Sequence, residues 1–299
     1  MGRHLLAAVL IAGAVLAWDP LYYQNRSSVL HSMETDGDIA IGFFSSGSYW
    51  RTDSTGESLE YDLDPSLSVL RLLATGSYGL TNSHTVGVVI PLYIQISGSD
   101  STGGGIADPW ITLDGWIERN PMIIARGALR IPLKGYLESG DYREGDPHMA
   151  LDGSVTVESP LSGPGMLVRA TAGLRYFFAA WSALPTSPRD SADTRPPVEL
   201  RGTGFLVFEA NPELDLRIGL EAATRGDTRA DFGDGWEDLD YTGRTELDLR
   251  AGFDLANSSG VRGDIYYRLS GENTNKEWGI AITGLGIDFT DLFGFGGSR

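Results

Sequence analysis

Hydrophobic and polar residues alternate with a period of two along most of the chain. In the segment 85–96 every even-numbered position is Val, Ile or Leu, and in 213–221, 246–255 and 261–270 charged residues stand between apolar ones. Successive side chains of a β-strand point to opposite faces, so each segment has one apolar face and one polar face. The pattern predicts an all-β chain.

Strands are expected at 37–50, 57–63, 66–79, 85–97, 107–119, 122–133, 148–159, 165–179, 198–209, 213–225, 243–256, 261–270 and 277–289. Proline cannot donate to a sheet ladder, so the second and third are either separated at Asp64-Pro65 or form one long strand, which gives about twelve. Most of these segments match the about 9–11 residues of a tilted membrane strand, whereas strands in soluble proteins average about 5–6.

The connections alternate in length. Short turns are expected at 79–84, 120–121, 211–212 and 257–260, and longer links at 97–106, 134–147, 180–197, 226–242 and 271–276. Short turns on one rim and long loops on the other are typical of outer-membrane barrels, as are aromatic residues at strand ends. We therefore expect an antiparallel transmembrane β-barrel of about 12 strands. A secreted soluble β-protein, with its apolar faces packed inward, is the alternative.

The N-terminus has the pattern of a secretory signal peptide. Arg3 and His4 precede an apolar core from Leu5 to Leu16, and Val15-Leu16-Ala17 is a small-residue cleavage signal. The expected organisation is a signal peptide over 1–17, an N-terminal extension over 18–36, the barrel over 37–293 and a tail over 294–299. Phe289 or Phe293 is expected to end the last strand, where the barrel-assembly machinery reads an aromatic residue.

The polar faces carry both signs of charge, and in a barrel these faces enclose the lumen. One interpretation is a salt-bridge lattice that closes the lumen, and the other is a filter for ions or solutes. The residues expected to line the lumen are Arg126, Arg130, Arg169, Arg175, Arg201, Arg217, Glu221, Arg244, Glu246, Asp248, Arg250, Asp264 and Arg268.

Composition narrows the candidate chemistry. The 299 residues include 40 acidic and 23 basic ones, no cysteine and four histidines, and the net charge is −17. The acidic balance argues against nucleic acid as a partner, and the lack of thiols excludes thiolate metal sites. We expect no metal and no cofactor. The acidic segment from Asp231 to Asp240 lacks EF-hand spacing, and whether it binds Ca²⁺ is left open.

An enzyme is not expected. His148, Asp152 and Ser154 share one strand face, but His148 and Ser154 are six residues apart, about 20 Å along a strand, so they cannot form a triad by themselves. The chain also has no Gly-x-Ser-x-Gly motif.

Between 78 and 178 the chain resembles the transporter-like outer-membrane family named for the meta-pathway of phenol degradation. The resemblance rests on Tyr78–Thr81, Ile90-Pro91, Gly103–Trp110, Leu129–Leu133, Ser139–Asp141, Gly145-Asp146 and Leu174–Tyr176. It implies a barrel of about this strand number that passes small molecules, hydrophobic ones among them, and it supplies no catalytic residues. The expected function is a passive channel in the outer membrane of a Gram-negative-type envelope, in contact with outer-membrane lipid and small-molecule solutes. A structural or adhesive barrel with a closed lumen is the alternative.

Overall fold

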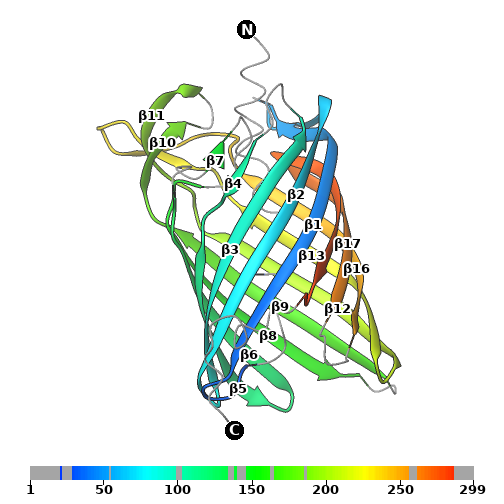
Figure 1. Cartoon of the computed structure of the whole chain (residues 1–299). Coiled ribbons are helices and arrows are strands. Elements are labelled where there is room, and N and C mark those ends of the chain that lie inside the picture. The colour runs from blue at the N-terminus through cyan, green and yellow to red at the C-terminus, as the bar shows by residue number, and fades with distance from the viewer. Residues whose placement is uncertain are drawn as a thin grey trace.

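A computed structural model describes residues 21, 29–53, 55–98, 103–133, 138–139, 146–161, 165–184, 187–255 and 261–285. Every multi-residue element in this part of the chain is a strand (Figure 1). No helix among these residues is long and apolar enough to cross a bilayer. The signal peptide expected over 1–17, the tail over 294–299, Phe289 and Phe293 lie outside the described residues.

Twelve of the described strands form one closed antiparallel barrel. They are β1 (Thr35–Thr52), β2 (Ser58–Thr81), β3 (His84–Ser97), β5 (Trp110–Arg119), β6 (Met122–Arg130), β8 (Ala150–Pro160), β9 (Met166–Phe177), β12 (Glu199–Asn211), β13 (Leu214–Arg225), β16 (Arg244–Leu255), β17 (Arg262–Glu272) and β18 (Thr274–Thr283). Each pairs with the next, and β18 pairs with β1 to close the ring, so the expected fold class is confirmed. The first strand begins two residues before the expected barrel boundary at 37.

The connections differ in length between the two rims of the barrel, as expected. We call the end with the turns 82–83, 120–121 and 212–213 the turn rim, and the other end the loop rim. The loop rim carries β4 (Gly104–Ile106), β7 (Glu138–Ser139), β10 (Ala180–Leu184), β11 (Ser187–Arg195), β14 (Arg229–Asp231) and β15 (Trp236–Asp238). Strands β10, β11, β14 and β15 form a second, small sheet at this rim (Figure 1).

The sequence left one connection undecided, at Asp64-Pro65, and predicted the length of another, at 271–276, wrongly. The segments on either side of Pro65 form one strand of 24 residues, β2. Its register with β1 shifts between Ser46, which faces Leu67, and Ser48, which faces Asp62, so the ladder omits the residues around the proline. The long link expected at 271–276 is instead a tight turn, in which Asn273 has a φ of 50°. Asn tolerates this left-handed conformation better than most residues.

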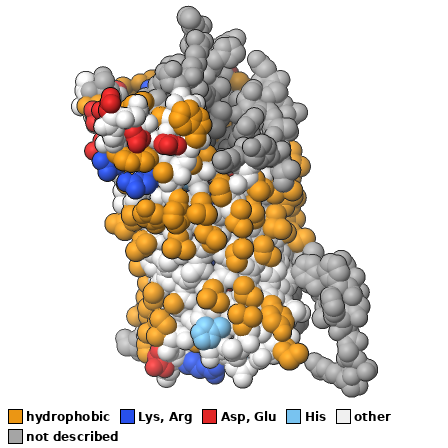
Figure 2. All heavy atoms as spheres, turned by 90° about the vertical axis from the view of Figure 1, so that its left-hand side faces the viewer, with side chains coloured by type: hydrophobic (Ala, Val, Ile, Leu, Met, Phe, Trp, Pro, Cys, Tyr) orange, Lys and Arg blue, Asp and Glu red, His pale blue; other side chains and the backbone are white. Residues whose placement is uncertain are grey.

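The apolar faces point outward. Leu216 and Leu249 are 46% and 40% exposed on the outer surface, whereas Arg250 and Arg268, on the opposite faces of their strands, are fully buried. On the face of the barrel seen in Figure 2, hydrophobic side chains form bands along the wall and the charged side chains lie near its two ends. A soluble sheet protein would bury the first group and expose the second, so the orientation supports the membrane-barrel interpretation.

Candidate functional site

The candidate site is the inner wall of the barrel. All thirteen charged residues expected to line the lumen lie on barrel strands, and none of them is exposed. Ten are buried, and Arg169, Arg201 and Glu221 are partly buried. They form an ionic arc, which we define as the inner faces of β6, β8, β9, β12, β13, β16 and β17.

Arg268 is the centre of the ion-pair network nearest the loop rim. Its Nε lies 2.8 Å from Asp248 Oδ1, and its Nη2 lies 3.0 Å from Glu246 Oε2 and 3.8 Å from Glu277 Oε1. Arg244 forms a further ion pair with Glu246. The buried charges are therefore mutually compensated, as burial in a poorly hydrated interior requires.

A second network lies deeper in the barrel, around Arg250. Its Nε is 2.5 Å from Glu221 Oε2 and its Nη1 is 2.9 Å from Asp264 Oδ2, so one guanidinium joins β13, β16 and β17. Toward the turn rim, Asp254 Oδ1 lies 2.9 Å from Arg262 Nε and Asp254 also pairs with Arg217.

A third network joins β8, β9 and β12. Asp152 pairs with Arg201 and lies 3.2 Å from Arg175 Nε, and Glu199 Oε1 lies 3.5 Å from Arg175 Nη1. Four further acidic residues on the inner wall were not among those expected from the sequence, namely Asp152, Glu199, Asp254 and Glu277. The same alternation that predicted Arg250 and Asp264 to face the lumen places all four of these residues on the inner face, so they could have been predicted from the sequence in the same way.

The wall opposite the ionic arc is more apolar, although polar and charged side chains are buried there too, namely Asp38, Ser46, Arg71, Thr85 and Gln95. We define the apolar arc as the inner faces of β1, β2 and β3, where Phe44, Val69, Leu73, Val89 and Tyr93 are at most 2% exposed. Arg71 is buried among them, with its guanidinium 4.0 Å from the centre of the Phe44 ring. Arg71 was not expected in the lumen because both faces of the segment 66–79 mix apolar and polar residues, so alternation does not show which face points inward.

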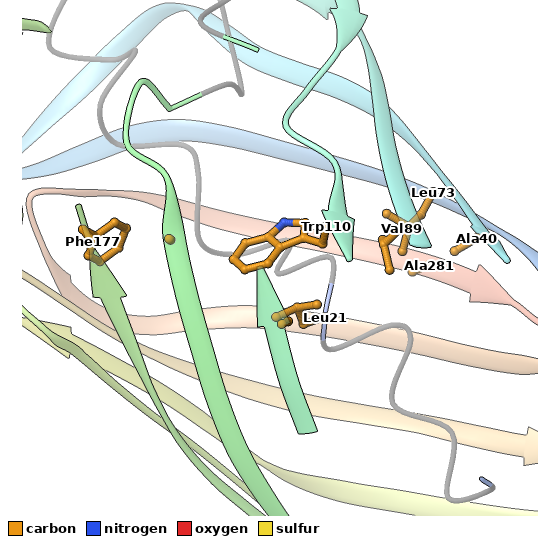
Figure 3. Packing of buried hydrophobic residues seen from close by; sticks show 9 residues of the cluster. Leu21, Ala40, Leu73, Val89, Trp110, Phe177 and Ala281 are labelled. Carbon is orange, nitrogen blue, oxygen red and sulfur yellow. The ribbon is translucent and has the colours of Figure 1, made fainter. Parts of the chain in front are cut away.

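Part of the N-terminal segment lies inside the barrel. Leu21 is buried in a cluster that includes Trp110 at the start of β5 and Phe177 at the end of β9 (Figure 3). The Leu21 carbonyl accepts a hydrogen bond of 3.0 Å from Arg126 Nη1, and Arg126 Nε lies 2.5 Å from Asp114 Oδ1. At this level the lumen is therefore narrowed by the chain itself.

Hydrogen bonds around Asp146 and His148 join three loop-rim connections. Its Nδ1 lies 2.6 Å from Asp146 Oδ1, and its Nε2 lies 2.9 Å from the hydroxyl of Thr194 on β11. Asp108 accepts hydrogen bonds from the backbone N–H groups of Leu133 and Asp146. Asp146, His148 and Thr194 are hydrogen-bonded in the acid–imidazole–hydroxyl sequence of a catalytic triad. Thr194 is only 1% exposed, however, so a substrate does not reach its hydroxyl, and we interpret these hydrogen bonds as links that hold the connections together.

Two of these loop carboxyls have shifted pKa values. Burial raises the pKa of Asp108 to about 6, against the lowering effect of its hydrogen bonds and of Arg130. Burial opposes ionisation of Asp146 too, but the charges of Arg130 and His148 outweigh it and hold the pKa of Asp146 well below its usual range. Arg130 Nη2 lies 3.1 Å from Asp146 Oδ2.

The acidic segment 231–240 belongs to the hairpin of β14 and β15. The carboxylate of Asp231 accepts hydrogen bonds from the backbone N–H groups of Gly233 and Gly235, so it stabilises the turn. Among the residues that the structure describes, no group of three or more His, Asp or Glu side chains is arranged to hold a metal ion.

The structure is similar to that of the COG4313 outer membrane channel from Pseudomonas putida F1. The TM-score is 0.68 and the identity 15%, over 87% of this chain and 97% of that one. The two chains share the fold of a closed antiparallel β-barrel.

Two further solved structures are less similar to this barrel. The NanC porin has a TM-score of 0.44 at 9% identity, over 82% of this chain and 97% of that one. The translocator domain of the autotransporter NalP from Neisseria meningitidis has a TM-score of 0.43 at 11% identity, over 85% of this chain and 90% of that one. No protein-family model and no curated protein matches the chain.

Proposed function

We propose that this barrel lies in the outer membrane and is a passive channel for small molecules, hydrophobic ones among them. The observation that carries the proposal is the divided inner wall. Val69, Leu73 and Val89 are buried on one side of it, while the compensated charges of the ionic arc lie on the other. A uniformly charged wall would exclude apolar solutes, and a uniformly apolar one would exclude water and small polar solutes.

The resemblance of residues 78–178 to the phenol meta-pathway family supports the same proposal. Export by the signal peptide at 1–17 and insertion by the barrel-assembly machinery belong to it as well. The thirteen charged residues predicted for the lumen act here as the polar side of the route. Their ion pairs leave little net charge along the wall, which suits neutral solutes better than ions.

The experiment is flux through the purified barrel. The full chain in liposomes is expected to admit small neutral solutes in a swelling assay and to give discrete conductance in planar bilayers. The matched control is the chain denatured before reconstitution. If a sample whose circular dichroism shows β-structure gives neither liposome swelling nor conductance, the channel function is refuted.

A specific observation favours the second candidate, a structural barrel with a closed lumen. Arg250 and Arg268 are fully buried on the inner wall, which means that water does not reach them in this state. Under this hypothesis neither sugars nor small aromatic molecules cross the liposome membrane. Swelling with any of them would exclude it.

A further inference from the structure

The small sheet at the loop rim has one buried face and one exposed face. Strands β10 and β11 continue the hairpin of β9 and β12 beyond the barrel, and β14 and β15 continue that of β13 and β16 (Figure 1). Ala192, Thr194 and Ala230 point to the buried face and are at most 2% exposed. Trp181 points to the opposite face and is 66% exposed, so this face is accessible from outside the barrel.

A row of four side chains crosses the exposed face. Asp193 on β11 faces Trp181 on one side and Asp231 on the other. Asp231 in turn faces Trp236 on β15. Directly opposite residues share one face of a sheet, so a tryptophan stands at each end of the row and two carboxylates lie between them. Neighbouring strands are about 4.8 Å apart, so three strand spacings place the Cα atoms of the two tryptophans about 14 Å apart.

Two arginines form a second row beside the first. Arg195 and Arg229 face each other in the ladder, two residues along their strands from the two carboxylates. Arg229 forms an ion pair of 3.0 Å with Asp238. The Arg195 guanidinium lies 4.9 Å from the centre of the Trp236 ring, close enough for a cation–π contact that holds this ring. The exposed face therefore combines aromatic surfaces with hydrogen-bond donors and acceptors.

The charges in the two rows nearly cancel. Three carboxylates, of Asp193, Asp231 and Asp238, stand beside the two guanidinium groups, which leaves a net charge of −1. A polyanion or a polycation therefore meets groups of its own sign here, and neither finds a complementary surface. Carboxylates accept hydrogen bonds, guanidinium groups donate them, and a hydroxyl group does both. The polar groups thus match an uncharged ligand that is rich in hydroxyl groups.

A saccharide chain has this chemistry and a fitting shape. The flat side of a pyranose ring exposes C–H groups that pack against an indole ring, while its hydroxyl groups lie around the edge. An extended chain of about three to four β-linked units spans the distance between the two tryptophans. We propose that the exposed face of the small sheet binds a neutral, extended β-linked oligosaccharide, with Trp181 as its open stacking surface.

This role is separate from passage through the lumen and needs only the proposed location in the outer membrane. In outer-membrane barrels the longer loops lie on the outside of the cell. Exposed tryptophans also occur at membrane interfaces, which makes a lipid surface the competing partner. The row lies six residues beyond the last ladder pair of β9 and β12, Arg175 with Glu199, and its two carboxylates would repel anionic lipid headgroups.

The test is isothermal titration calorimetry of the full chain in micelles of a detergent without a sugar headgroup. Cellobiose is too short to reach both tryptophans, whereas cellotetraose reaches both. Cellotetraose should therefore bind about 10-fold more tightly. It should also bind more tightly than β-linked tetramers of glucosamine, which are cationic, or of glucuronate, which are anionic. Equal affinity for cellobiose and cellotetraose, or tighter binding of a charged tetramer, would overturn the proposal.

The variant Trp181→Ala removes one stacking surface from an exposed position, where truncation costs little stability. Its affinity for cellotetraose should fall about 10-fold, to that of wild type for cellobiose. The matched control is Trp278→Ala, which removes an exposed tryptophan from the outer wall of β18, outside the small sheet, and should bind cellotetraose as wild type does. Unchanged binding in Trp181→Ala refutes the site.

Fluorescence separates the saccharide from the lipid partner. The difference in emission between wild type and Trp181→Ala in lipid vesicles reports on Trp181. We expect aqueous iodide to quench this difference and brominated lipid chains to leave it unchanged. Quenching by the brominated lipid would place Trp181 in the membrane and overturn the proposal.

Flux distinguishes this site from the channel. Liposome swelling without binding of cellotetraose would refute the site and leave the channel standing. Binding of cellotetraose without swelling or conductance would refute the channel and support the site.

Discussion

Replacing Arg250 tests whether the buried ion pairs of the ionic arc stabilise the barrel. Its guanidinium is fully buried between Glu221, 2.5 Å away, and Asp264, 2.9 Å away. The substitution Arg250→Met keeps a long side chain and removes the positive charge. Two carboxylates then face each other in a poorly hydrated interior without their shared cation.

Removing one member of a buried ion-pair network typically destabilises a protein by about 3–5 kcal/mol, because the remaining charge is left uncompensated. We expect a loss of this size in the free energy of unfolding of Arg250→Met. Replacing the partners too, in Arg250→Met with Glu221→Gln and Asp264→Asn, should recover most of the loss, since no unpaired charge remains.

The assay is urea unfolding of the barrel in lipid vesicles, followed by fluorescence of the seven tryptophans. The matched control is Arg229→Met, because Arg229 pairs with Asp238 at 3.0 Å on the exposed hairpin, where the side chains are 42% and 66% accessible. An exposed pair contributes about 0–1 kcal/mol. Equal, small losses in both variants would show that water fills the lumen around Arg250, and the reasoning would be refuted.

Three further predictions test the outer wall, the lumen and the loops. Leu220→Arg, at mid-strand on the outer face, should lower the free energy of unfolding in vesicles by about 2–4 kcal/mol. Leu80→Arg, at the turn rim, should lower it by about 0–1 kcal/mol, and equal losses in the two variants would contradict an apolar belt. Arg126→Ala removes the hydrogen bond to the Leu21 carbonyl and should raise single-channel conductance; an unchanged current would show that Leu21 does not narrow the route. Burial raises the pKa of Asp108 from 3.8 to about 6, so the folded protein binds the carboxyl proton of Asp108 more tightly than the unfolded chain does. The free energy of unfolding should therefore fall by about 3 kcal/mol as the pH rises from about 4 to about 6. Asp108→Asn should flatten the pH dependence of unfolding in that window, and an unaltered slope would contradict the assignment.

The alternation of side chains was enough to predict the strands of the barrel and which of their faces are apolar or polar, but not the short strands β10, β11, β14 and β15, which lie in segments expected to be links. In β13 and β16, charged residues alternate with Leu and Ile, so the two faces differ in solvation whatever the environment. Strand length and the two classes of connection then favoured a barrel over a sandwich. Alternation, strand length and connection length each depend on residues that are close together in the chain, so they can be predicted from the sequence.

The partners of the buried charges could not be predicted in this way. Arg250 meets Glu221 and Asp264 only because β16 lies between β13 and β17 in the closed ring, and Arg268 meets Glu277 only across the next pair of strands. Register and ring closure bring together residues that are far apart in the chain, and alternation contains no information about either.

The amino-acid sequence by itself determined a series of β-strands, each with one apolar and one charged face, and predicted from their lengths that they form an antiparallel β-barrel, because a period of two and the strand lengths follow from the residues alone. Only the tertiary structure decided that one side of the lumen is more apolar than the other. Between Leu67 and Leu73 both faces of β2 carry hydrophobic residues, so its inward face is fixed by pairing with β1 and β3. The same closure turns Asn275 toward Tyr49. The set of side chains on each side of the lumen therefore depends on contacts between strands, which no single segment of the chain specifies.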